Sequence, residues 1–93
     1  MPTMKKPPSF LESLETALIS GLNAAGIRAK VDWEPVPTTK LWRLMVVASK
    51  FAALKHYERQ DLVWRIASQT LDRDQQLMIS MIITMTPDEA AGR

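Results

Sequence analysis

The feature that most constrains the fold is a change in the spacing of apolar residues at Gly26. Before it, leucines recur three or four residues apart, the spacing that places side chains on one face of an α-helix; they are Leu11, Leu14, Leu18 and Leu22. After it, apolar and charged residues alternate from Ile27 to Trp33, as in a half-buried strand. Glycine accepts the left-handed backbone conformation that ends many helices. We therefore predict a helix that ends at Gly26 and is followed directly by a strand.

The start of this helix is predicted at Ser9. Ser9 and Glu12 form a capping-box pattern, in which each side chain can bond a backbone N–H of the first turn. Residues 1–8 carry two lysines followed by prolines and lack the apolar core of a signal peptide, so a flexible tail is expected. Residues 9–91 are expected to form a single domain, because 93 residues with 46% hydrophobic content suffice for one core.

The middle of the chain predicts a second strand and a second helix. Residues 34–40 include two prolines and are predicted to be a loop. The apolar run at 41–48 is short and rich in valine and tryptophan, which favours a strand buried on both faces and paired antiparallel with the first. Helical spacing returns around Lys55 and continues to Thr70, with Asp61 and Arg65 placed for an i,i+4 ion pair.

The last third predicts a strand and a short helix. The polar residues 72–76 are expected to break the preceding helix, and the apolar residues 77–85 to form a third strand. Thr86, Pro87 and Glu89 have the pattern of a cap and first helical turn. The predicted fold class is α/β (α+β), with the order α-β-β-α-β-α.

Composition excludes several classes of function. The chain has no cysteine, which excludes disulfides, thiolate metal sites and cysteine nucleophiles. Its net charge of +2 is below that of a dedicated nucleic-acid binder, and no segment approaches the roughly 20 apolar residues of a membrane span. No spacing supports a Ser-His-acid triad, a phosphate-binding glycine loop or a metal-ligand cluster. We expect a cytoplasmic protein that is not an enzyme and has no cofactor, metal or membrane partner.

Two segments resemble the BolA family, whose α/β fold is related to the KH type of RNA-binding domain. Phe51, Arg59, Val63 and Trp64 have the spacing of the family segment F-x-G-x-x-x-x-x-R-H-R-x-V-Y, and "TMTPDE" is similar to its terminal T-x-T-P-E-E. The resemblance covers roughly residues 10–90. It implies a class II KH-like arrangement, a three-stranded mixed sheet with helices on one face.

The departures from the family concern its iron–sulfur chemistry. The family ligates a cluster, shared with a monothiol glutaredoxin, through a histidine at the start of the last strand and a Cys or His in the first inter-strand loop. Met78 stands at the first of these positions, and the loop at 34–40 contains neither residue. Methionine is a poor replacement for imidazole or thiolate in such a cluster. The resemblance thus implies a glutaredoxin partner, but we do not expect cluster ligation here.

Function is expected to lie in binding, in one of two ways. The favoured interpretation is a BolA-like module that acts through contacts with an unknown protein partner. The alternative is a DNA- or RNA-binding regulator, although the three glycines cannot form the G-x-x-G turn with which KH domains grip phosphate. Lys55 and Arg59 lie one helical turn apart, where like charges repel slightly. Two interpretations follow: the pair binds an anionic partner, or it lies on the surface and is screened by solvent. The candidate binding residues are Lys40, Arg43, Lys55 and Arg59.

The other conspicuous residues are assigned structural roles. His56, the single histidine, is interpreted as a solvated surface residue, and Asp72 and Asp74 as a charged turn. Trp42 and Trp64 are expected in the core. For Trp33, a core position and a place on a surface that stacks nucleic-acid bases are given equal weight. Core positions are favoured over an adaptable partner surface for Met78, Met81 and Met85.

Overall fold

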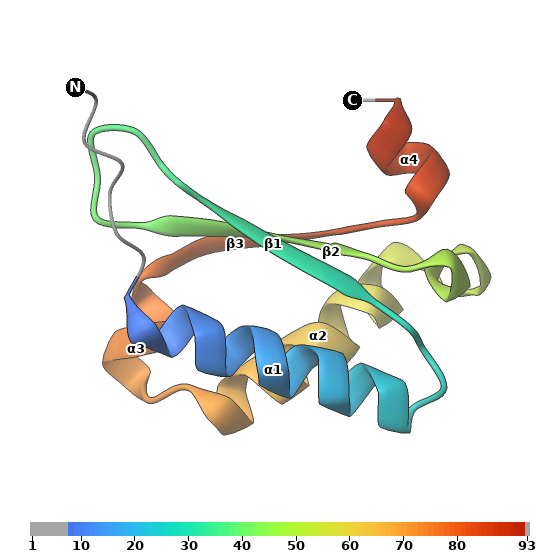
Figure 1. The fold of residues 1–93 in the computed structure, drawn as a ribbon, viewed down its shortest axis with the longest axis horizontal. Coiled ribbons are helices and arrows are strands. Elements are labelled where there is room, and N and C mark those ends of the chain that lie inside the picture. The colour runs from blue at the N-terminus through green and yellow to red at the C-terminus, as the bar shows by residue number, and fades with distance from the viewer. Residues whose placement is uncertain (1–7, 93) are drawn as a thin grey trace.

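A computed structural model describes residues 8–92 (Figure 1). The elements are α1 (Ser9–Ala24), β1 (Lys30–Pro35), β2 (Trp42–Val47), the 3₁₀-helix η1 (Ser49–Ala53), α2 (His56–Thr70), α3 (Arg73–Leu77), β3 (Ile79–Met85) and α4 (Pro87–Ala91). The three-stranded sheet has the order β1-β2-β3, with β1 antiparallel and β3 parallel to β2. The predicted fold class and mixed sheet are confirmed. Of the predicted tail, residues 1–7 lie outside the described residues.

Helix α1 ends as predicted but begins differently. Its four leucines, Leu11, Leu14, Leu18 and Leu22, are fully buried in the core. Gly26 has a φ of +80°, and the N–H of Ile27 donates to the Leu22 carbonyl at 2.8 Å, which closes the helix. The predicted capping box at Ser9 is wrong, because Pro8 occupies the cap position and no side chain caps the helix. The extended backbone of Pro8 leads the chain directly into the first turn, where Leu11 N–H donates to the Pro8 carbonyl at 3.1 Å.

The two long helices pack side by side on one face of the sheet (Figure 1). Gly21 lies where they meet, since a Cβ at this position would be 2.8 Å from Cδ1 of Ile66. The missing side chain therefore lets α1 and α2 approach closely. Figure 1 shows the short α4 beyond the end of β3, on the other side of the sheet.

Strand β2 is buried on one face, not on both as predicted. Trp42, Leu44 and Val46 point toward the helices and are buried. The alternate residues, Arg43, Met45 and Val47, are only partly buried. The difference arises because α1 and α2 both cover the same face, and residues 8–92 form no comparable layer on the second face (Figure 1).

Several element boundaries also differ from the prediction. Strand β1 continues into the predicted loop, where Glu34 pairs with Arg43 and Pro35 with Trp42. The predicted break at 72–76 instead contains α3, because Asp72 accepts the Gln75 N–H at 2.8 Å and the Gln75 side chain accepts the Asp72 N–H at 3.0 Å. Strand β3 consequently begins at Ile79 rather than at residue 77. The predicted cap at Thr86 is confirmed, with Glu89 completing the box.

Candidate functional site

The structure places the four predicted basic residues at two ends of the sheet. Lys40 and Arg43 lie near the β1–β2 turn, whereas Lys55 and Arg59 follow the other end of β2. The four residues of β2 that follow Arg43 extend about 13 Å at roughly 3.3 Å per residue. Arg43 is paired with Glu34, directly opposite on β1, at 2.7 Å. The four residues therefore do not form one basic patch.

Arg59 is a buried structural residue. Its Nε donates to the Phe51 carbonyl at 2.8 Å, and its Nη1 donates to Oε1 of Glu89 at 3.0 Å. The guanidinium carbon lies 5.8 Å from the centre of the Phe51 ring, within cation–π range. Arg59 thus joins η1, α2 and α4, and its hydrogen-bonding groups are turned away from solvent.

The carboxylate of Glu89 receives bonds from two elements. The Thr86 backbone N–H donates to it at 2.8 Å, and Arg59 donates from α2. These two hydrogen bonds, led by that of Thr86, hold the pKa of Glu89 below its ordinary value. The sequence pattern identified Glu89 as part of a cap, but its second bond joins residues 30 positions apart in the chain.

The remaining singled-out side chains divide between core and surface. Trp42 is buried, and Trp33 and Trp64 are partly buried against the core. Among the methionines, Met85 is buried and Met78 partly buried, whereas Met81 is 46% exposed on the sheet. Lys55 and His56 are exposed at the start of α2, Asp74 is exposed in α3, and Asp72 caps that helix.

A side chain of α2 bonds the outer edge of β3. Nε2 of Gln60 donates to the Ile82 carbonyl at 2.8 Å and to Oγ1 of Thr84 at 3.2 Å. The pairing of β2 with β3 leaves the Ile82 carbonyl on the side away from β2, which is where another strand would add. The Gln60 side chain therefore bonds one of the acceptors on this edge.

The outer edge of β1 is open. Val36 N–H donates to the Leu41 carbonyl at 3.0 Å, and the same register places Glu34 opposite Arg43 and Asp32 opposite Met45. In an antiparallel pair, alternate residues bond the neighbour, so the even-numbered residues of β1 bond β2. Val31 and Trp33 therefore turn their backbone N–H and C=O groups outward, and no strand among residues 8–92 pairs with them.

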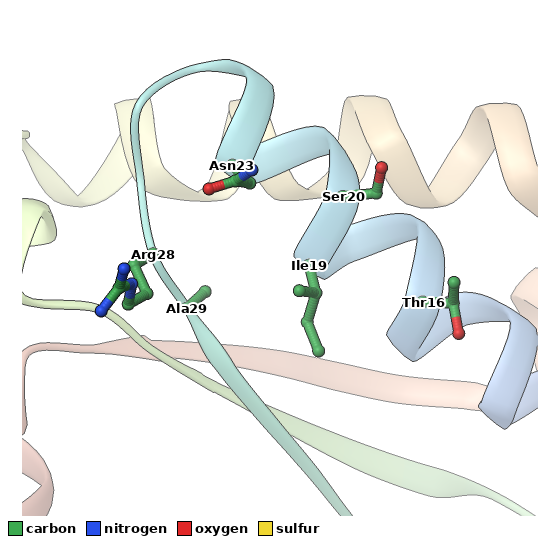
Figure 2. A pocket seen from close by; sticks show the side chains of 6 residues that line it. All are labelled: Thr16, Ile19, Ser20, Asn23, Arg28 and Ala29. Atoms are coloured by element: carbon green, nitrogen blue, oxygen red, sulfur yellow. The ribbon is translucent and has the colours of Figure 1, made fainter.

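A groove runs between this edge and α1. Its larger part, with a volume of about 480 Å³, is lined by Thr16, Ile19, Ser20, Asn23, Arg28 and Ala29 (Figure 2). Figure 2 shows Ile19 extending from α1 toward the sheet, whereas Arg28 points away from the helix. A smaller hollow of about 140 Å³ continues past Glu15 along Val31, Asp32 and Trp33.

This arrangement offers hydrogen-bonding backbone beside an apolar surface. An extended chain can bond the outward groups of an edge strand while its side chains enter adjacent hollows. Sequence analysis did not identify this site. The available signal was Ile19, an apolar residue next to the leucine stripe rather than in it, which is 38% exposed in the structure.

Two kinds of site are not found in the part of the chain that the structure describes. No group of three or more His, Asp or Glu side chains could hold a metal ion. Within residues 8–92, every helix is too short or too polar to cross a membrane.

Comparisons with known proteins find similarity in structure and not in sequence. No family model matches the sequence, and no curated protein matches it. Among solved structures, the fold is similar to that of a bol-like protein from Babesia bovis, with 17% sequence identity and a TM-score of 0.48. The match covers 99% of this chain and 100% of that chain.

Proposed function

We propose that the protein is a cytoplasmic, non-enzymatic BolA-like module that acts through protein contacts and ligates no iron–sulfur cluster. The observation that carries the proposal is the open edge of β1 beside the groove of α1. The binding mode is strand addition, in which an extended segment of a partner pairs with β1. Backbone hydrogen bonds supply affinity in this mode, and the flanking side chains select the partner.

The charges along β1 define the chemistry of the segment. Arg28 and Lys30 lie at its beginning, and Asp32 and Glu34 follow toward its end. When a segment pairs antiparallel with β1, its C-terminal half lies beside Arg28 and Lys30 and its N-terminal half lies beside Asp32 and Glu34. The complementary segment is therefore basic in its first half and acidic in its second, with small or apolar residues between the charges.

A selection from displayed random linear peptides tests the proposal. The enriched peptides, added to ¹⁵N-labelled protein, are expected to shift the amide resonances of Val31 and Trp33, because these N–H groups would bond the added strand. Lys30→Glu is expected to weaken peptide binding, whereas Asp74→Lys, at an exposed position in α3, should leave it unchanged. No enrichment, or shifts confined to other surfaces, would contradict the proposal.

Nucleic-acid binding stays a prediction of the sequence. The burial of Arg59 and the Glu34 partner of Arg43 leave Lys40 and Lys55 as the exposed members of the predicted set. Fluorescence anisotropy with short single- and double-stranded DNA and RNA at two salt concentrations tests it, since phosphate-driven binding weakens steeply with salt. Salt-sensitive binding that is lost in the Lys40→Ala, Lys55→Ala double variant would favour this function over protein contacts.

A further inference from the structure

We infer that the segment that pairs with the β1 edge is β1 of a second copy of this chain. The inference rests on the proposed function, because it names the occupant of the same edge. Its basis is that the charges of residues 28–34 are self-complementary about Val31.

Antiparallel pairing about a twofold axis at Val31 brings opposite charges together. Lys30 of each copy lies opposite Asp32 of the other, and Arg28 of each copy lies opposite Glu34 of the other. The axis therefore generates four attractive pairs and no repulsive one. A twofold interface uses the same residues on both subunits, so self-complementarity is what it requires.

The neighbouring registers are less favourable. An axis at Asp32 lets the outward groups of Val31 bond those of Trp33 in the other copy, but it places Asp32 directly opposite Asp32. An axis at Trp33 leaves outward groups at the centre but places Asp32 opposite Glu34 of the other copy. Like charges directly opposite each other on neighbouring strands are destabilising.

The inner charge pair is also well placed geometrically. Since Val31 would exchange hydrogen bonds with its counterpart, Lys30 and Asp32 would form the adjacent non-hydrogen-bonded pair, where side chains approach most closely. Both residues are exposed, and neither makes an ion pair with another described residue. Glu34 already bonds Arg43, so the inner pair is the better one to test.

The helical side of the edge supplies apolar contact. Val31 would meet Val31 of the second copy, and the groove that contains the exposed Ile19 would face its counterpart across the axis. Pairing would join the two sheets into one of six strands and cover Ile19. The open edge and the open groove would thus be closed by the same event.

Charge reversal tests the inference on the full chain by analytical ultracentrifugation. Wild-type protein is expected to show a concentration-dependent dimer. Lys30→Glu and Asp32→Lys are each expected to weaken it by about tenfold or more, because each places like charges opposite each other twice. An equimolar mixture of the two variants should recover the dimer, since one copy then carries two acids and the other two bases. Asp74→Lys is the matched control, and thermal melting confirms that each variant folds.

The outcomes separate this inference from the proposed function. The inference is overturned if wild-type protein remains monomeric up to millimolar concentration, if the single variants dimerise normally, or if mixing restores nothing. In that event, peptide-induced shifts at Val31 and Trp33 would still support strand addition by another protein. If those shifts are absent as well, both proposals fail.

Discussion

The two edges of the sheet differ in whether a side chain of the protein bonds their outward backbone groups. On β3, the Gln60 side chain bonds the outward carbonyl of Ile82. On β1, the outward groups of Val31 and Trp33 meet no strand among residues 8–92, and both residues line the groove of α1. The difference follows from connectivity. The segment from β2 to β3 crosses through α2, which can return a side chain to the strand that follows, whereas α1 reaches β1 only through a short turn.

An open edge is a risk to a small protein, because any extended chain can pair with it. Natural proteins reduce this risk with charged side chains on the exposed strand. The charges at Lys30 and Asp32 repel most registers of self-pairing and favour one. We therefore expect the edge of β1 to be selective as well as open, whereas Gln60 bonds a carbonyl on the edge of β3.

The largest expected effect on stability is that of replacing Arg59, whose side chain bonds both η1 and α4. Arg59→Ala should lower the free energy of unfolding by about 3 kcal/mol, because the buried Phe51 carbonyl loses its donor and η1 loses its link to α4. Urea denaturation measures the change.

Arg65→Ala is the matched control on the same helix. Its exposed pair with Asp61, at 2.6 Å, should contribute less than about 0.5 kcal/mol. Similar small losses in both variants would contradict a structural role for Arg59.

A smaller effect is expected at the covered edge itself. Gln60→Ala removes the donor to the Ile82 carbonyl and should cost about 1 kcal/mol. The same change frees the Ile82 carbonyl for pairing at the β3 edge. The double variant Gln60→Ala, Lys30→Glu should therefore still self-associate, although Lys30→Glu alone is expected to weaken pairing at β1. Denaturation and ultracentrifugation of the single and double variants measure both effects. Gln69→Ala, at an exposed position of α2, serves as control. Unchanged stability in Gln60→Ala would show that the bond does not secure this edge.

The smallest effect is the pH dependence contributed by Glu89. Because its pKa is lower in the folded protein than in the unfolded chain, its stabilising contribution is present above the ordinary glutamate pKa. That contribution is lost as the pH falls through the ordinary pKa and then through the lowered value of the folded state.

Melting temperatures of wild-type and Glu89→Gln protein, measured from pH 7 to pH 3, check this sign. Wild-type protein should be the more stable at neutral pH, and the two should converge in acid. A constant difference across the range would mean that ionisation of Glu89 contributes nothing.

Local signals predicted much of the fold. The leucine stripe, the glycine stop at Gly26 and the cap at Thr86 each depend on residues within one or two turns of each other, so the sequence was sufficient. The same local reasoning failed at Ser9, where the preceding proline supplies the helix entry, and at Asp72, whose capping bond with Gln75 turns a polar break into α3.

The candidate site was not predictable in the same way. Arg59 and Lys55 look like one basic face in the sequence, but Arg59 is buried because Phe51 and Glu89, 8 and 30 positions away, converge on it. The alternation of apolar and charged residues around Val31 indicated a strand, and it indicated which side chains lie on the buried face and which on the exposed face. It could not indicate which strand would lie at an edge.

The sequence alone therefore predicted most of the elements and contains the self-complementary charges of β1, because both follow from the order of neighbouring residues. Only the tertiary structure decided that β1 is an open edge, that Gln60 occupies the opposite one and that Arg59 is internal. These properties depend on which helix crosses which strand, and hence on contacts between residues far apart in the sequence.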